Sequence, residues 1–252
     1  MDRFLNLIRI FIPREFSTVI VGSIKFVGRN KRGFGIRGIA VKGFEIEPEL
    51  RFVKKFLRTG DTFLDIGANT GIYSLHASRY VGDFGNVLAF EPNIEIAYCL
   101  SRAVELNAFT NVVVLPIGVS EKQGVSEFFH NFEKPNSYSL LKHDVNATKE
   151  SIFTISLDQY FENQELQNLS YIKIDVEGSE SKVIQGGYET IAKYRPVIQV
   201  EFTIADVNFD LPGYVVVHIL NSPNLLLVPS EQLQSVTGIL AEGFNFETRD
   251  VW

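Results

Sequence analysis

The sequence predicts an α/β protein with an open, doubly wound and mostly parallel sheet, and three observations lead to this fold class. From residue 44 onward, short apolar runs rich in β-branched residues alternate with helical patterns, which is typical of strand–helix–strand units. Toward the end of the chain, two apolar runs flank Asn-Ser-Pro-Asn at 221–224, which predicts a closing antiparallel hairpin. Before residue 44, a helical pattern and runs rich in Gly, Val and Ile predict a small N-terminal extension of a helix and strands. Right-handed crossovers then place helices on both faces of the sheet.

Size and composition place the chain among globular proteins that fold without covalent or metal supports. A chain of 252 residues can bury roughly three quarters of the surface that its unfolded form exposes. Hydrophobic residues make up 45% and charged residues 21%, which excludes a disordered chain, a collagen and a coiled coil. The single cysteine, Cys99, excludes a disulfide framework and a zinc site built from several cysteines.

The net charge of −6 is unevenly distributed along the chain. Residues 1–60 carry thirteen Lys and Arg against five Asp and Glu, whereas the remainder carries eleven against twenty-five. An acidic body lacks the broad positive face that attracts phosphates, so we expect no nucleic-acid partner. The basic end suits an anionic glycan or membrane surface.

We divide the chain into an N-terminal extension, 1–43, and a main domain, 44–252. The extension begins with a predicted amphipathic helix over 1–13, and short strands with a turn at 30–33 follow it. The apolar face of that helix contains Phe4, Leu7, Ile8, Phe11 and Ile12. Three uses of the helix stay open: docking on its own domain, a shallow membrane anchor, or a contact in an oligomer. No run reaches the roughly 18 apolar residues of a transmembrane helix, and no cleavage site follows, so we expect a cytoplasmic chain with peripheral membrane contact as the alternative.

The main domain is divided into elements by its periodicity and its turn residues. The expected helices span 48–58, 71–81, 94–106 and 179–194. The expected strands span 62–66, 86–90, 112–115, 125–129, 152–155, 171–175, 197–202, 214–220 and 225–228. We expect 125–129 and 152–155 to be antiparallel around a long loop. Because ligands of doubly wound sheets bind outside the carboxyl ends of the strands, the residues just after each strand are the candidates for a site.

The first candidate is the turn after strand 62–66, with the pattern D-x-G-x-x-x-G from Asp65 to Gly71. Its glycines permit a sharp bend and a close approach to a ligand, and the helix that follows offers free N–H groups. A dinucleotide site needs glycine where Asn69 and Ile72 stand, and a phosphate-binding loop needs a lysine after Gly71. What remains suits a ligand with a ribose and a carboxylate but no phosphate, and S-adenosylmethionine is such a ligand.

The second candidate is Glu91, which follows strand 86–90 and lies 24 residues after Gly67. A carboxylate at this place can accept hydrogen bonds from both ribose hydroxyls. It can equally act as a negative charge at the start of the next helix, and the two roles are compatible. Gly118, after the third strand, is expected beside the adenine.

The third candidate is the stretch from Tyr171 to Glu180. Alternation puts Tyr171, Lys173 and Asp175 on one face of the strand. A lysine in an apolar strand needs a partner, for which Asp175, Asp65 and Glu201 are the candidates. Asp175 and Glu177 lie at the carboxyl end of their strand. Glu201 ends the following strand, and two roles stay open for it: a place in the acceptor pocket, or pairing with Lys173 or a helix start.

These segments resemble the FkbM-type family of S-adenosylmethionine-dependent methyltransferases. The matching pieces are FLDIGANTGIYSL, AFEPN, ISLDQYF, YIKIDVEGSE and RPVIQVEF, of which IKIDVEG is the specific one. The resemblance covers about residues 45–230. It implies a Rossmann-like class I methyltransferase sheet in the main domain and S-adenosyl-L-methionine as the cofactor. It also implies O-methylation of a hydroxyl on a sugar, a glycan or glycolipid, or a secondary metabolite, so the expected partner is a small-molecule or glycan acceptor.

The family motif assigns roles to individual residues. The residues implied at the cofactor are Asp65, Gly67, Ala68, Asn69, Gly71 and Glu91. The residues implied near the methyl group and the acceptor are Asp175, Glu177 and Glu201.

Methyl transfer from a sulfonium is an in-line displacement, so positioning supplies most of the catalysis. We predict that Glu177 or Glu201 takes the acceptor's proton and that Asp175 holds the methionine end or the acceptor. The loop 130–150, with His143 as a less favoured base, is a candidate lid.

The same carboxylates and glycines bear on metal dependence and on two other function classes. Asp175, Glu177 and Glu201 offer oxygen ligands to Mg²⁺, but metal-ligand spacing is absent and no metal is expected. The alternatives to an enzyme of this class are a non-catalytic scaffold that keeps the cofactor site, and a nicotinamide-dependent oxidoreductase, which the missing glycines disfavour.

Overall fold

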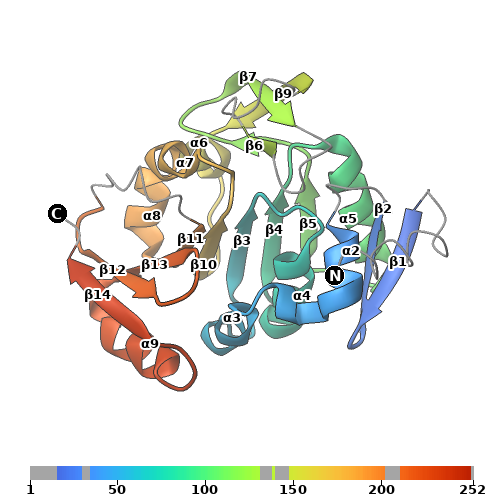
Figure 1. The fold of residues 1–252 in the computed structure, drawn as a ribbon. Helices are drawn as coiled ribbons and strands as arrows, with labels where there is room; N and C mark the ends of the chain where they lie inside the picture. Colours follow the sequence, from blue (N-terminus) through green and yellow to red (C-terminus); the bar gives the residue numbers. More distant parts are fainter. Residues whose placement is uncertain (1–15, 30–34, 131–137, 140–147, 202–210, 251–252) are drawn as a thin grey trace.

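The computed structural model describes residues 16–29, 35–130, 138–139, 148–201 and 211–250. A large sheet crosses the middle of the molecule with helices on both faces, a small sheet lies above one end of its strands, and a hairpin lies at one side (Figure 1). The predicted helix over 1–13 and the turn at 30–33 lie outside the described residues. The fold class predicted from the sequence is confirmed.

The large sheet has eight strands in the order β14-β12-β13-β11-β10-β3-β4-β5. The parallel strands are β3 Thr62–Ile66, β4 Asn86–Phe90, β5 Val112–Leu115, β10 Leu169–Ile174 and β11 Val197–Glu201. The antiparallel pairings involve β13 Asn224–Pro229, β12 Tyr214–Ile219 and β14 Phe246–Asp250. The chain leaves β3 toward β5 on one side and returns to β10 on the other, so the winding reverses between β3 and β10. This reversal is where a ligand crevice is expected.

Helices cover the two faces with separate apolar cores. The helices are α2 Ile36–Lys42, α3 Leu50–Phe56, α4 Ile72–Val81, α5 Ile94–Leu106, α6 Leu157–Phe161, α7 Glu180–Gly186, α8 Tyr188–Tyr194 and α9 Leu233–Leu240, with 3-10 helices η1 Gly43–Ile46 and η2 Ser230–Gln232. Helices α2 to α5 and α9 pack on one face, and α6 to α8 pack on the other. Tyr171 belongs to the first core and Ile172 to the second, which confirms the predicted alternation along β10.

The predicted helix over 179–194 is wrong in one respect, because it breaks into α7 and α8 at Gly187. A Cβ on Gly186 would lie 2.2 Å from the carbonyl oxygen of Ser120, and one on Gly187 would lie 2.9 Å from Leu157 Cδ1. The glycine pair therefore permits a close approach to neighbouring segments, and such pairs are common sites of helix kinks.

The prediction of strands before residue 44 is also wrong for residues 35–46, which form the helices α2 and η1. Ile36 and Ile39 are buried three residues apart, on one face of a helical turn. The β-branched and glycine content of this region favoured a strand, whereas burial of these two side chains favours a helix. Helix α9 and strand β14 were not predicted.

The described part of the extension forms a hairpin of β1 Phe16–Val21 and β2 Ile24–Arg29, turning at Gly22 with φ of 59°. Ile24 and Phe26 have no exposed surface and belong to the same core as α4 and α5. The domain boundary at residue 43 stays a prediction.

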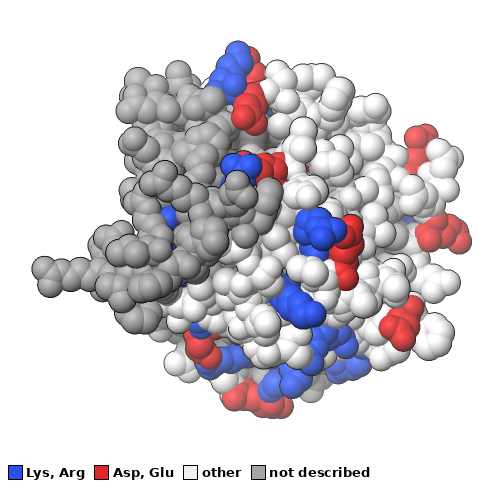
Figure 2. Space-filling model, turned by 90° about the vertical axis from the view of Figure 1, so that its right-hand side faces the viewer, with Lys and Arg blue, Asp and Glu red and all other residues white. Residues whose placement is uncertain are grey.

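On the hairpin side of the molecule, Lys and Arg gather over the lower part of the face in Figure 2. Within the described ranges, no helix combines the length and the apolar character needed to cross a bilayer.

The small sheet has the order β6-β9-β7-β8. Its strands are β6 Gly118–Val119, β7 Gly124–His130, β8 Tyr138–Ser139 and β9 Thr148–Ile155. Strands β7 and β9 are antiparallel, which confirms the predicted pair. Most of the predicted lid between them, including His143, lies outside the described residues, so the lid stays a prediction.

Candidate functional site

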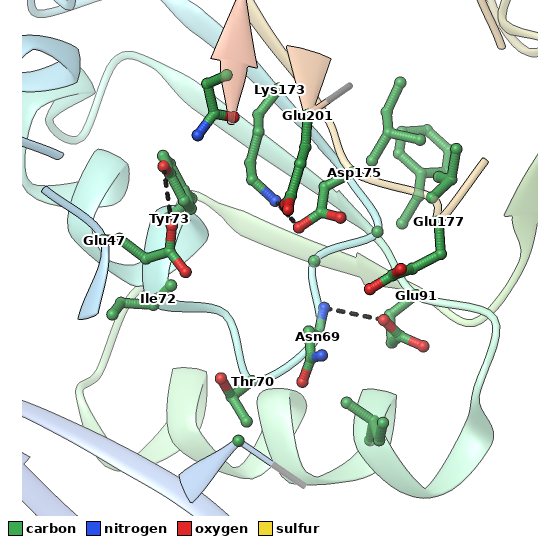
Figure 3. A pocket seen from close by; sticks show the side chains of 18 of the residues that line it. Glu47, Asn69, Thr70, Ile72, Tyr73, Glu91, Lys173, Asp175, Glu177 and Glu201 are labelled. Carbon is green, nitrogen blue, oxygen red and sulfur yellow. Dashed lines mark hydrogen bonds and ion pairs between the residues drawn. The ribbon is translucent and has the colours of Figure 1, made fainter. Parts of the chain in front are cut away.

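A cavity of about 600 Å³ opens at the carboxyl ends of β3, β4, β10 and β11, where the winding of the sheet reverses (Figure 3). Most of the predicted site residues line it: Gly67, Ala68, Asn69, Glu91, Gly118, Asp175, Glu177 and Glu201. Asp65 and Gly71 do not belong to the described lining. The structure therefore brings the predicted donor and acceptor residues to one hollow.

The turn after β3 is built around Gly67, whose φ of 81° is in the left-handed region. The N–H groups of Gly67 and Ala68 both donate to the carbonyl of Phe90, at 2.9 and 3.0 Å. A Cβ on Gly67 would lie 1.8 Å from the carbonyl oxygen of Asp175, so a side chain cannot be accommodated there. Glycine at this position allows the ends of β3 and β10 to meet at the floor of the cavity.

Two predicted cofactor residues lie behind the wall instead of in it. Asp65 has no exposed surface, and Ser74 donates its hydroxyl to Asp65 Oδ2. A Cβ on Gly71 would lie 2.1 Å from Leu100 Cδ1, so this glycine allows α4 to pack closely on α5. Asp65 is enclosed beneath α4 and Gly71 faces α5, so their contact with the cofactor stays a prediction.

Glu91 is 5% exposed and accepts backbone N–H groups on both oxygens. Asn69 donates to Oε2 at 2.8 Å and Asn93 donates to Oε1 at 2.9 Å. Asn93 also caps α5, since its side chain accepts the N–H groups of Glu95 and Ile96. Burial raises the pKa of Glu91 to about 7, although the hydrogen bonds from Asn93 and Asn69 act to lower it. The carboxyl group is thereby held in one position between the glycine turn and the start of α5.

Lys173 is buried in β10, and its partner is Asp175, one of the three candidates named from the sequence. Its Nζ donates to Asp175 Oδ2 at 2.9 Å and lies 4.8 Å from the centre of the Tyr73 ring. Burial acts to lower the pKa of Lys173, but the charges of Asp175 and Asp65 outweigh it and raise the pKa. Lys173 therefore remains an ammonium ion beneath the cavity.

Glu177 and Glu201 stand at the mouth of the cavity, where both reach solvent. Glu177 has φ of 54° and precedes Gly178 with φ of 99°, and the carboxyl group of Glu180 holds this turn by accepting the N–H groups of Val176 and Gly178. Desolvation and then the charge of Asp175 raise the pKa of Glu177 to about 8 and that of Glu201 to about 7. Both carboxyl groups therefore titrate near neutral pH.

One wall of the cavity was missed by the sequence reasoning. Glu47 follows η1 and lines the cavity together with Tyr73 of α4. Tyr73 donates its hydroxyl to Glu47 Oε2 at 3.3 Å and accepts the Nε2 amide of Gln199 at 2.9 Å. The available signal was Gln199, because an amide inside an apolar strand has to find buried partners.

No group of three or more His, Cys, Asp or Glu side chains in the described part of the chain is arranged to hold a metal ion. Asp175, Glu177 and Glu201 approach the same end of the cavity, but Asp175 is already bonded to Lys173. Metal independence stays a prediction.

The mostly parallel sheet, whose winding reverses beneath the cavity and whose β13 lies antiparallel between β11 and β12, is the class I methyltransferase fold that the resemblance implies. Over residues 65–220 the chain matches the model of the methyltransferase FkbM domain, and it belongs to that family.

The comparisons also give individual relatives. The chain is 28% identical over 137 residues to the hexuronic acid methyltransferase AglP of Haloferax volcanii, a match that covers 54% of each chain. It is 26% identical over 153 residues to methyltransferase sdnD of Sordaria araneosa, covering 49% of this chain and 59% of the relative. It thus spans about half the length of the curated relatives it matches. Among solved structures it is similar to methyltransferase FkbM from Methylobacillus flagellatus KT, with a TM-score of 0.47 and 16% identity over 77% of this chain and 53% of that one.

Proposed function

We propose that the protein transfers a methyl group from S-adenosylmethionine to a hydroxyl of a sugar, a glycan or glycolipid, or a secondary metabolite. The observation that carries the proposal is the shared cavity, in which the glycine turn and Glu91 face a second set of carboxyl groups, Asp175, Glu177 and Glu201. Membership of the FkbM methyltransferase family supports the reaction class. One relative is named for a hexuronic acid, which supports a sugar as the acceptor.

The residues present fit the methyl donor. Gly67 lets the turn after β3 pass directly over the end of β10 as part of the cavity wall, and Glu91 is fixed where it can accept ribose hydroxyls. Asn69 Oδ1 is buried at the wall and has no hydrogen-bond partner among the described residues, so it can accept a donor from a ligand. When bound, S-adenosylmethionine supplies a methyl group on a positively charged sulfur. We infer that Gly67, Ala68, Asn69 and Glu91 hold it, with Gly118 beside the adenine.

The acceptor's proton is assigned to Glu177 or Glu201. An alcohol is a weak nucleophile and gains from a base whose pKa lies near the working pH. With pKa values of about 8 and 7, these two carboxyl groups meet that condition at the cavity mouth. Asp175 is bonded to Lys173 and is therefore suited to orienting the acceptor hydroxyl instead of taking its proton. The carboxylate-rich lining also favours a ligand that carries a positive charge.

Calorimetric titration with S-adenosylmethionine and S-adenosylhomocysteine tests the donor half of the proposal. We expect wild-type protein to bind both ligands and Glu91→Gln to bind each about tenfold more weakly, because a charged acceptor at the ribose is lost. Glu105→Gln, an exposed carboxylate on α5, is the matched control and should bind like wild type. Absence of binding to wild type would contradict the proposal.

Incubation with a methyl-labelled donor and extracts of glycans, lipids and small metabolites tests the transfer itself. We expect label in a hydroxyl-bearing compound, and its loss in Asp175→Asn and in the double variant Glu177→Gln/Glu201→Gln. Donor binding without label in any extract would instead favour a non-catalytic scaffold.

A further inference from the structure

The wall formed by Glu47 and Tyr73 has no role in the function proposed above. Figure 3 shows Glu47 and Glu91 on opposite sides of the cavity, with Asn69 between them. A ligand whose ribose is bound at Glu91 therefore has its other end directed across the glycine turn toward Glu47 or toward the mouth of the cavity.

A chain of buried hydrogen bonds fixes Glu47 as an acceptor. Tyr171 donates its hydroxyl to Gln199 Oε1 at 2.9 Å, which sets the orientation of the Gln199 amide. Gln199 Nε2 then donates to Tyr73 Oη at 2.9 Å and to Asn224 Oδ1 at 3.1 Å. Because Tyr73 Oη accepts from Gln199, its own proton is directed to Glu47 Oε2, 3.3 Å away. Gln199 has no exposed surface, and Tyr73 and Tyr171 are 2% exposed or less, so the chain is shielded from water.

The remaining oxygen of Glu47 points into the cavity in Figure 3. The charges around this oxygen are unbalanced. Glu47, Asp175 and Glu201 line the same end of the cavity. Among the described residues of the lining, Lys173 carries the positive charge, and its ammonium is bonded to Asp175. A second cation is therefore electrostatically favoured beside Glu47. The amino-acid end of S-adenosylmethionine carries such a cation, an α-ammonium group.

We propose that Glu47, held by Tyr73 and Gln199, binds the α-ammonium group of the methyl donor. The inference rests on the proposed function, because it takes S-adenosylmethionine as the ligand. It adds a donor-binding residue from the segment before the sheet, outside the stretch that matches the family model. It also predicts that the donor's amino-acid end lies along α4, across the cavity from Glu177, which leaves Glu177 to the acceptor.

The test pairs a variant of the protein with a variant of the ligand. The two ligands are S-adenosylhomocysteine and its deamino analogue, in which hydrogen replaces the ammonium group, and calorimetry measures both dissociation constants. We expect Glu47→Gln to bind S-adenosylhomocysteine about tenfold more weakly and the deamino analogue as tightly as wild type does. Tyr73→Phe, which removes the hydroxyl that holds Glu47, should show the same selectivity with a smaller loss of about threefold. The matched control is Glu45→Gln, an exposed carboxylate paired with Arg51, which should bind both ligands normally.

The remaining outcomes separate the inference from the proposed function. If wild type binds S-adenosylhomocysteine and Glu47→Gln binds it equally well, Glu47 belongs to the acceptor side. That result overturns the inference and leaves the proposed function standing. If the variant weakens both ligands alike, Glu47 acts through the fold and the inference is also overturned. If wild type binds neither ligand, the inference and the proposed function are both contradicted. Tyr73→Phe gives the same readout if Glu47→Gln fails to fold.

Discussion

The two sides of the cavity hold their carboxyl groups in different ways. On the β3–β4 side, Glu91 is enclosed and accepts a backbone N–H on each oxygen. On the β10–β11 side, Glu177 and Glu201 reach solvent next to Asp175, and desolvation and then the charge of Asp175 raise the pKa values of both. The first arrangement fixes a carboxyl group in one enclosed position, whereas the second leaves carboxyl groups that reach solvent at the cavity mouth. Under the proposed function, the first is the binding side and the second the reactive side of one cavity.

The largest expected effect comes from Gly67→Ala, which breaks the binding side. Its Cβ would lie 1.8 Å from the carbonyl oxygen of Asp175, and φ of 81° is strained for alanine. Strain and overpacking together should lower the free energy of unfolding by about 4 kcal/mol and abolish binding of S-adenosylhomocysteine. Chemical denaturation and calorimetry measure the two effects.

Gly124→Ala is the control for that substitution. A Cβ at Gly124 would have no heavy atom within 4 Å, so the free energy of unfolding should change by less than about 0.5 kcal/mol. A Gly67→Ala protein as stable as this control would contradict the close contact of β3 and β10 under the cavity.

The next effect comes from Lys173→Met, which breaks the reactive side. The change leaves Asp175, Asp65 and Glu47 without the buried ammonium that stabilises their charges. We expect the free energy of unfolding to fall by about 3 kcal/mol at pH 7, a value limited by the partial solvent contact of Asp175. Because protonation relieves the unpaired charges, the loss should shrink at pH 5, as measured by urea denaturation at both pH values. An equal loss at both would show that packing, not charge, accounts for it.

The sequence predicted the parts of this architecture that depend on local pattern. The bounds of β3, β4, β5 and α5 are as expected, because each strand is a short, mostly apolar run and α5 has a polar cap at Asn93. The position of the site followed as well, since the carboxyl ends of parallel strands converge wherever the winding reverses.

The parts that were missed depend on packing between distant segments. Glu47 reaches the cavity because η1 and α3 pack against α4, and no periodicity in residues 35–49 indicates that arrangement. Asp65 and Gly71 share a motif with Gly67, yet their surroundings differ: one is enclosed by Ser74 and the other by Leu100. A motif identifies which turn forms the site, but only tertiary contacts decide which of its residues face the ligand.

The pH dependence of donor binding tests the same comparison of the two sides of the cavity, and its expected effect is smaller. Burial raises the pKa values of Glu91 and Glu47 to about 7, and both should bind the donor best as carboxylates. Raising the pH from 6 to 8 removes their protons, so S-adenosylhomocysteine should bind about threefold to tenfold more tightly at pH 8. Calorimetry in buffers of different ionisation enthalpy should also detect protons released on binding. An affinity that falls over this range would contradict the assignment of these carboxyl groups to the donor.

The smallest expected effect is a gain in stability in Glu201→Gln. The pKa of Glu201 is about 7 in the folded protein against an ordinary 4.5, so the folded state binds this proton more tightly than the unfolded state. Stability contributed by the proton is present below pH 4.5 and is lost as the pH rises to about 7. Glutamine cannot lose a proton, so Glu201→Gln should melt about 2 °C higher than wild type at pH 8 and should show little gain at pH 5.

Glu127→Gln, an exposed carboxylate paired with Lys149 on the small sheet, should show no pH-dependent difference in Tm. A higher Tm of Glu201→Gln at pH 8 together with loss of methyl transfer would connect stability and reactivity on this side of the cavity. The high proton affinity of Glu201 weakens the fold at high pH. The same affinity suits a group that takes a proton from an acceptor hydroxyl. A gain of equal size at both pH values would remove that connection, since a neutral packing effect does not change with pH.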